Sequence, residues 1–160
     1  MAEYRVTISD WLPCSTNKTI GVRWQVKNRL KEADSRRIQA EFDYAGVPPV
    51  RITKFQRKLR KTLAMALKQP DDPTPIRRRV QLEVTFGKGV RQRDPDNFVK
   101  GLLDGLKRAC MLYDDSLTWC EMVLPPLYAK GERTETTIIL TDIPAYTMPR
   151  AANQTARSRA

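Results

Sequence analysis

Histidine is absent from the 160-residue chain. An imidazole therefore cannot serve as a general base, activate a nucleophile or bind a metal in this protein. Any metal ion must be held by oxygen atoms, which favours hard cations with carboxylate ligands. The absence of histidine thus narrows the metal chemistry to Mg²⁺ or Mn²⁺ above all.

Cysteine is scarce, and the chain contains only Cys14, Cys110 and Cys120. Three widely separated cysteines fit neither a disulfide framework nor the paired spacing of a zinc site. We expect all three to be reduced and partly buried, where they act as small hydrophobic residues.

Long apolar runs are also absent. No segment approaches the roughly 18 to 20 continuous apolar residues that cross a bilayer, and the first residues lack the basic start and apolar block of a signal peptide. These absences predict a soluble, cytoplasmic protein with no membrane partner. Hydrophobic residues make up 41% of the chain, which is enough for one buried core, so a single domain is expected.

Positive charge is what the chain has in excess, with 29 Lys and Arg residues against 18 Asp and Glu and a net charge of +11. Such an excess is typical of proteins that bind polyphosphate. Ribosome association and simple solubility are the alternatives. We favour nucleic-acid binding because the basic residues are clustered.

Hydrophobic periodicity predicts both helices and strands. Alternating apolar residues predict strands over residues 4–9 and 77–86. Apolar residues at helical spacing predict helices over residues 24–45, 51–69 and 95–107.

Two further strands are predicted nearer the C-terminus, over residues 117–128 and 132–141, and the AKGE segment between them predicts a hairpin. Together these elements predict a single α+β domain over residues 1–142, in which a mixed or antiparallel sheet packs with two to three helices. The polar, basic residues 143–160 are predicted to be a flexible tail.

Two of these elements have a clear apolar face. Alternate residues of the strand 77–86 are apolar, and so is every third or fourth residue of the helix 95–107. The positions predicted to be buried are Val80, Leu82, Val84, Phe86, Phe98, Leu102, Leu106 and Ala109.

Two short acidic groups stand out in this basic chain: Asp94 and Asp96, which flank Pro95, and the pair Asp114 and Asp115. Capping of a helix that has Pro95 at its first position explains the first group, but it does not explain the second. The predicted helix rises about 18 Å, and an extended return of five steps covers roughly 17 Å. The second pair is therefore expected to come back level with the first, where a divalent cation would offset the repulsion between carboxylates.

Lys100 and Asp104 follow Asp96 at intervals of one helical turn, so the three residues share one helix face. One interpretation is a pair of salt links on a solvated surface. The other places Lys100 beside the metal, where its charge stabilises a phosphate in the transition state.

Basic residues surround the acidic motif in the sequence. A basic rim can hold a nucleic-acid backbone while a metal ion bound by carboxylates activates water, and cleavage of a phosphodiester requires both. The residues predicted to contact DNA are Arg77, Arg78, Arg79, Lys88, Arg91, Arg93 and Asn97.

The motif RDPDN at 93–97, followed by Lys100, Asp104 and YDDS at 113–116, resembles the signature of the RusA family of Holliday junction resolvases. That signature is an arginine, then DxDN, a lysine and an aspartate at the same steps, and a DD pair at this distance. The segments YRVTISDWLPCSTN and VRITKFQRKLRKTL are also similar to the family's first strand with its loop and to its first core helix. The resemblance covers most of the chain between about residues 4 and 141.

This resemblance implies a homodimeric endonuclease that binds four-way DNA junctions and makes paired symmetric cuts in opposing strands. It implies Mg²⁺, with Mn²⁺ as a substitute, and no small-molecule cofactor. Asp94, Asp96 and Asp115 would be the metal-binding carboxylates, Lys100 the catalytic lysine, and Arg93 an aid at the phosphate. A bacterial, phage or prophage origin would suit so small a resolvase.

Two further residues are assigned supporting roles. Asp114 matches the family pattern beside Asp115. Asn17 is expected to approach the site from the N-terminal loop.

The chain departs from the family pattern in three places. Residues 18–49, which include the first charged helix, are expected to be an insertion relative to compact members. Leu112 stands where some members carry an aromatic residue, and Pro95 replaces the commoner leucine. Because no departure removes a carboxylate, we expect an intact site.

Three other functions stay open from the sequence. A broader branched-DNA or flap nuclease would use the same metal site on a different substrate. A non-catalytic nucleic-acid-binding protein would use the aspartates only to cap a helix. An enzyme that acts on RNA is equally compatible with the charge of the chain.

Overall fold

The computed structural model of the protein describes residues 1–14, 24–50, 76–92, 94 and 96–147, without the side chains of residues 24–28 and Asp96. Within these residues the elements are β1 (Glu3–Ser9), α2 (Trp24–Tyr44), β2 (Arg77–Phe86), α4 (Asp96–Arg108), β3 (Cys120–Met122), β4 (Leu127–Lys130) and β5 (Glu135–Ile143). The predicted α+β class with a mixed sheet is confirmed. The helix predicted over residues 51–69 lies outside the described residues, as does most of the predicted tail.

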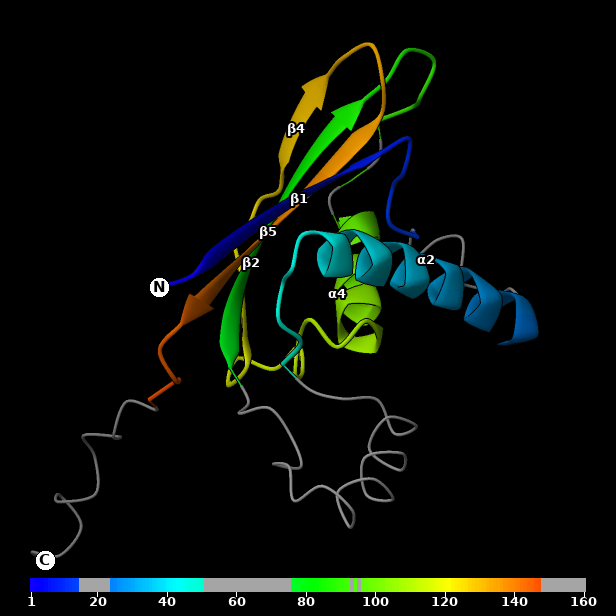
Figure 1. Cartoon of the computed structure of the whole chain (residues 1–160). Coiled ribbons are helices and arrows are strands. Elements are labelled where there is room, and N and C mark those ends of the chain that lie inside the picture. The colour runs from blue at the N-terminus through cyan, green and yellow to red at the C-terminus, as the bar shows by residue number, and fades with distance from the viewer. Residues whose placement is uncertain (15–23, 51–75, 93, 95, 148–160) are drawn as a thin grey trace, which may run out of the picture.

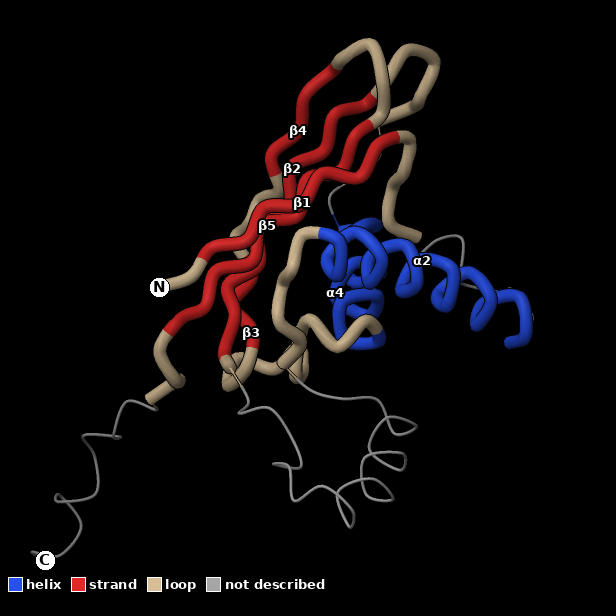
Figure 2. Tube along the Cα trace, viewed as in Figure 1, coloured by secondary structure: helices blue, strands red, loops and turns tan. Residues whose placement is uncertain are grey.

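β2 is the central strand of the sheet. β5 pairs antiparallel with one edge of β2, and β1 pairs antiparallel with β5. β3 and β4 both pair in parallel with β2, β3 near its start and β4 near its end (Figure 2). The predicted hairpin between the last two strands is therefore wrong, because β2 lies between β4 and β5. Alternation of apolar residues marks a strand but does not say which strands are neighbours.

The two helices cover one face of the sheet (Figure 1). The opposite face carries mostly polar side chains, among them Arg5, Gln81 and Glu83. On that polar face Arg79 Nε lies 3.0 Å from a carboxylate oxygen of Glu121, and the hydroxyl groups of Thr7 and Thr137 are 2.8 Å apart. This alternation of polar and apolar side chains along each strand is typical of a sheet with one solvated face.

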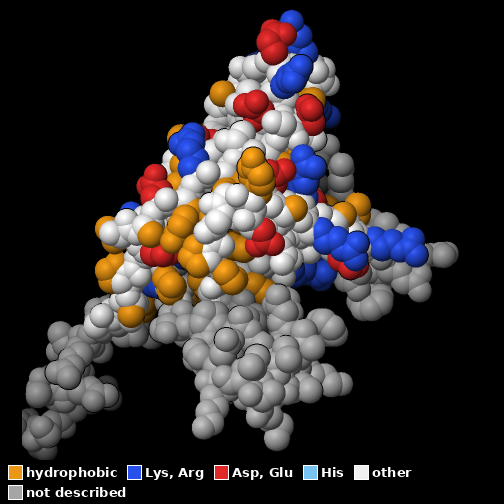
Figure 3. All heavy atoms as spheres, viewed as in Figure 1, with side chains coloured by type: hydrophobic (Ala, Val, Ile, Leu, Met, Phe, Trp, Pro, Cys, Tyr) orange, Lys and Arg blue, Asp and Glu red, His pale blue; other side chains and the backbone are white. Residues whose placement is uncertain are grey.

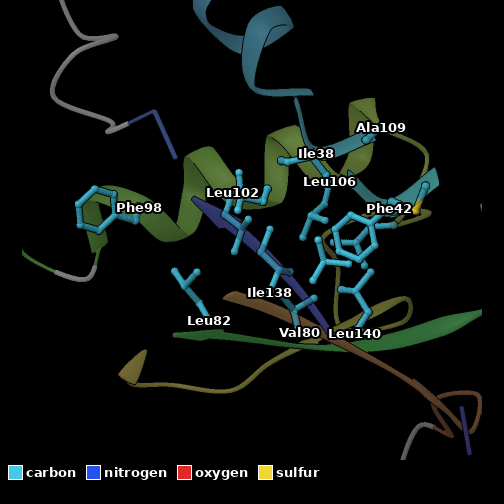
Figure 4. Packing of buried hydrophobic residues seen from close by; sticks show 14 of the residues in the cluster. Ile38, Phe42, Val80, Leu82, Phe98, Leu102, Leu106, Ala109, Ile138 and Leu140 are labelled. Carbon is cyan, nitrogen blue, oxygen red and sulfur yellow. The ribbon is translucent and has the colours of Figure 1, made fainter. Parts of the chain in front are cut away.

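The core lies between the helices and the sheet (Figure 4). All eight positions predicted to be buried are buried, seven in β2 and α4 and the eighth, Ala109, directly after α4. The helix α2 adds Ile38 and Phe42, both fully buried, to the same cluster. Most of the segment expected to be an insertion thus supplies a core helix, because α2 covers an apolar surface that α4 alone would leave exposed. No helix in the described part of the chain is long and apolar enough to span a bilayer.

Both helices end in the same backbone arrangement. After α2 the residue with positive φ is Gly46, at 70°, and after α4 it is Cys110, at 62°. In α4 the Cys110 amide donates to the carbonyl of Lys107 and the Met111 amide donates to the carbonyl of Leu106. These are the two hydrogen bonds of a Schellman motif, which turns the chain sharply away from the helix axis.

Candidate functional site

Asp94 lies at the start of α4. Its carbonyl oxygen accepts a hydrogen bond from the Asn97 amide at 3.1 Å, and its side chain is exposed. This bond spans three residues and closes the turn that leads into α4, which begins at Asp96. The predicted position of Asp94 at the helix start is therefore confirmed, and its carboxylate is accessible from solvent.

Lys100 is exposed one turn beyond Asp96 on α4. No described ion pair joins Lys100 to Asp104, as the salt-link interpretation would require. Asp104 instead pairs with Lys31 of α2 at 2.6 Å and with Lys107 at 3.5 Å. Among the described carboxylates Lys100 has no partner, so its ammonium group faces solvent.

Asp115 lies beside the last turns of α4. One of its carboxylate oxygens is 3.0 Å from Lys107 Nζ, and its side chain is 41% exposed. From Asp96 to Lys107 the helix rises about 16 Å at 1.5 Å per residue. Asp115 is therefore about three turns away from the start of α4, where Asp94 lies.

The chain after α4 does not return alongside the helix as the spacing predicts. The Schellman motif at Cys110 turns it toward the start of β2, and Met111 and Leu112 are buried there. A turn at Ser116 then leads into β3, whose first residue pairs with Arg78. An extended return would have exposed the large apolar side chains of Met111 and Leu112. The free energy gained by burying them favours the observed path of the chain.

Lys31, Asp104, Lys107 and Asp115 form one chain of alternating charges. Partial burial on its own would raise the pKa of Asp104, but the hydrogen bond and charge of Lys31, with a further contribution from Lys107, hold that pKa below its ordinary value. Burial would lower the pKa of Lys107, but Asp115 and Asp104 raise it above its ordinary value. Asp104 and Lys107 are thus both stabilised in their charged forms.

Two other groups near Asp115 also have shifted pKa values. The pKa of Asp114 is lowered, mainly by a hydrogen bond from the Asp115 backbone and by one from the Ser116 side chain. Burial, with the nearby charge of Asp115, raises the pKa of the Cys120 thiol to about 11. Cys120 is therefore an inert buried thiol, as expected of a small hydrophobic residue.

A complete metal site is not assembled by the side chains that the structure describes, because no three His, Cys, Asp or Glu among them come close enough to bind an ion. The side chain of Asp96 lies outside this set. By chemistry the donors suit Mg²⁺, since aspartate oxygens are its preferred protein ligands. Their positions do not allow the carboxylates of one chain to bind the same ion, because Asp94 and Asp115 lie at opposite ends of α4.

The three arginines at the start of β2 differ in exposure. Arg78 is fully buried, and its guanidinium donates to Asp142, to the Met111 carbonyl and to the Pro48 carbonyl at 2.8 to 3.0 Å. The prediction that Arg78 contacts DNA is wrong, because every arm of its guanidinium is committed to the fold. Arg77 donates to the Leu117 carbonyl, and only Arg79 is substantially exposed, on the polar face of the sheet.

The other predicted DNA contacts lie at the opposite end of β2. Lys88 and Arg91 are exposed in the loop between β2 and α4, and Asn97 is half-buried in the first turn of α4. Arg93 and Asn17 lie outside the described residues. Of the basic rim, therefore, only the part contributed by Lys88 and Arg91 is described next to Asp94.

Sequence reasoning missed the roles of Lys31 and Lys107. The signal for Lys107 was present, since it stands three residues after Asp104 on one helix face. The contact of Lys31 with Asp104 joins two elements that are far apart in the chain, and no local pattern predicts it.

Neither the protein-family models nor the curated proteins contain a match to this chain.

Proposed function

We propose that the protein is a metal-dependent DNA endonuclease of the RusA type, which binds four-way junctions as a homodimer and cuts two opposing strands. The observation that carries this proposal is the placement of Asp94. Its exposed carboxylate stands at the start of α4, directly after the exposed basic residues Lys88 and Arg91. A carboxylate next to phosphate-binding cations is the combination that phosphodiester hydrolysis needs.

The charge of the chain supports a polyanionic substrate. With a net charge of +11, phosphate contacts should supply most of the binding free energy and make it fall steeply with salt. The motif RDPDN with Lys100 and the Asp114–Asp115 pair supports the choice of the RusA type over other nucleases.

A second copy of the chain would complete the carboxylate set. Asp115 is about three turns of α4 away from Asp96 in its own chain, but it is partly exposed and therefore accessible to another molecule. Two exposed apolar side chains flank it in sequence, Tyr113 and Leu117, with exposures of 38% and 69%. In a two-fold dimer any such contact is made twice, so two identical sites would form.

Mg²⁺, when bound, supplies activation of water and neutralisation of charge on the phosphate. The chain's own groups then have separate tasks. Asp94 and Asp96 from one copy and Asp115 from the other would provide its oxygen ligands. Lys100 faces solvent without a described carboxylate partner and offsets charge on the scissile phosphate.

The test is incubation of the purified protein with a synthetic mobile four-way junction, with and without Mg²⁺. We expect paired cuts in opposing strands only when Mg²⁺ is present. Flapped duplex, linear duplex and a matched RNA junction serve as competing substrates. Failure to cut any of them would overturn the proposal, and equal cutting of the flap or of RNA would overturn the choice of substrate.

The Asp94→Asn variant connects the activity to the site. It should lose cutting but keep junction binding, or bind more tightly, because a negative charge near the phosphate is removed. Asp43→Asn, which alters an exposed carboxylate near the end of α2, is the matched control and should cut normally. Retained cutting by Asp94→Asn would refute the assignment of this residue.

A further inference from the structure

A groove of about 320 Å³ lies at the end of the sheet next to the start of α4. It is formed by two segments, the loop after β2 and the turn after β4, and its size is near the lower end of the range of roughly 300–1,000 Å³ found for ligand sites. The two segments lie side by side at this end of the molecule (Figure 1). The residues that line the groove include Phe86, Lys88, Val90, Gln92, Lys130 and Gly131.

Backbone geometry fixes the walls of this groove. A Cβ on Gly87 would lie 2.7 Å from the Thr134 amide nitrogen, and Gly89 has a φ of 76°. The Gly87 amide donates to the Thr134 hydroxyl at 3.1 Å, and the Gly131 amide donates to the Phe86 carbonyl at 3.0 Å. The close approach of the two segments therefore depends on glycine, which makes the groove a preformed feature of the fold.

Phe86, which lines the groove, connects it to the start of α4 through contacts between aromatic rings. The ring of Phe86 lies 6.2 Å from that of Phe98, in the first turn of α4, and 5.4 Å from that of Tyr128 in β4. Gln92, on the rim, stands two residues before Asp94. The groove therefore lies close to the start of α4, where Asp94 stands.

Lys88 and Lys130 are the charged side chains among the residues that line this groove. Lys130 lines it, is exposed and has no carboxylate partner among the described residues, and Arg91 is exposed in the adjoining loop. Lys88 pairs with Glu132 at 2.8 Å, but both side chains are more than three-quarters exposed, so this pair is weak and easily exchanged for a phosphate. Figure 3 shows basic and acidic side chains together at this tip of the molecule.

We propose that this groove is a subsite for the sugar–phosphate backbone of one DNA strand, held by Lys130 and Lys88 and passing on to Asp94. This inference rests on the proposed function, because it names the part of the substrate that the site grips. The exposed apolar side chain of Val90 and the glycine-rich walls allow a backbone and its sugar to approach closely. Lys130 is a new DNA contact that no motif in the sequence marks.

The first test measures junction binding by the full chain over a range of salt concentrations, without Mg²⁺. Lys130→Gln should reduce the slope of log affinity against log salt by about 0.9, which corresponds to one phosphate contact. Arg108→Gln, which removes an exposed cation at the opposite end of α4, is the control and should leave the slope unchanged. An unchanged slope for Lys130→Gln, or an equal reduction for both variants, would overturn the inference.

The second test locates the strand by nuclear magnetic resonance. A short single-stranded DNA should shift the amide signals of Gly87, Gly89 and Gly131 in the wild-type protein, whereas inorganic phosphate at the same phosphate concentration should shift them less. Equal shifts with free phosphate would reduce the site to a simple anion site, and larger shifts with a matched RNA strand would overturn the choice of DNA. Both outcomes contradict the proposal.

The two proposals fail in different ways. If wild-type protein cuts junctions with Mg²⁺ but Lys130→Gln keeps the full salt slope, the groove inference is wrong and the proposed function stands. If Lys130→Gln loses one contact but no substrate is ever cut, the groove is a DNA site on a protein that is not an endonuclease.

Discussion

Lys107 Nζ lies 3.0 Å from a carboxylate oxygen of Asp115 and 3.5 Å from one of Asp104. This pairing fixes Asp115 at the end of α4, whereas Asp94 stands at its beginning. The two acidic groups of the sequence are thus separated within one chain by the length of a helix. If both belong to one metal site, each site must combine residues from two copies.

Mixing two inactive variants tests this arrangement. Asp94→Asn and Asp115→Asn should each abolish cutting as homodimers. When the two are unfolded together and refolded, about half of the dimers are mixed, and each mixed dimer has one site with both aspartates if the site is shared between copies. We therefore expect the mixture to nick one strand of a four-way junction, measured on a denaturing gel.

A site within one chain gives the opposite result, because every site in a mixed dimer would then lack one aspartate. The control is the double variant Asp94→Asn, Asp115→Asn mixed with wild type. In its mixed dimers every shared site should lack one aspartate. An inactive mixture of the two single variants, beside active wild type refolded in the same way, would show that the site is not shared between copies.

The charge chain from Lys31 to Asp115 should contribute to stability in a defined pH range. Asp104 has a pKa below its ordinary value of 3.8, so its contribution is present above that value and is lost as the pH falls through the lowered pKa. Lys107 has a pKa above 10.5, so its contribution is lost only at higher pH. Asp104→Asn should therefore lower the free energy of unfolding by about 1–2 kcal/mol at neutral pH.

Urea unfolding at several pH values checks this expectation. The difference between wild type and Asp104→Asn should stay constant from about pH 5 to 9 and shrink below about pH 4. The exposed carboxylate of Asp43 serves as the reference, since Asp43→Asn should change stability by less than about 0.5 kcal/mol. A difference that persists unchanged in acid would mean that Asp104 acts through packing and not through its charge.

Much of the fold could be predicted from local patterns. β2 and α4 each carry an apolar face at the right period, so Val80, Leu82, Leu102 and Leu106 were identifiable as core from sequence alone. The pairing of the strands could not be predicted, because the position of β2 between β4 and β5 depends on contacts between distant segments. Local periodicity carries no information on those contacts.

The candidate site was predictable only at its beginning. Asp94 stands at the helix start and is exposed, as its local motif predicts, since helix-start chemistry is decided within a few residues. The position of Asp115 depends on Cys110, which takes the positive φ that glycine normally occupies. No glycine marks this sharp turn in the sequence, so an extended return was the natural but incorrect expectation.

Arg78 should behave as a structural residue. Its buried guanidinium pairs with Asp142 and donates to two backbone carbonyls. Arg78→Met should lower the free energy of unfolding by about 3–5 kcal/mol, because it leaves a carboxylate and two carbonyls without their donor. Chemical unfolding of the purified variant measures the loss.

Arg79, the next residue of β2, serves as the comparison for Arg78. Its side chain is 45% exposed and pairs with Glu121 on the polar face, so Arg79→Met should cost less than about 1 kcal/mol. Arg78→Lys keeps the charge but loses the planar fork and should fall between these values. Similar losses for Arg78→Met and Arg79→Met would contradict the structural role of Arg78.

Two glycines of α4 should respond differently to alanine. A Cβ on Gly101 would lie 1.9 Å from the carbonyl oxygen of Cys14, whereas a Cβ on Gly105 would meet only the terminal methyl group of Ile38, at 2.7 Å. The Cys14 backbone cannot easily retreat, because its amide donates to Asp34 at 2.6 Å. Alanine adds helix propensity of about 1 kcal/mol at either position, so only the clash distinguishes them. Thermal unfolding should therefore show that Gly101→Ala is destabilised by about 1–3 kcal/mol, whereas Gly105→Ala is close to wild type in stability. Equal stabilities of the two variants would mean that the N-terminal loop does not pack against α4.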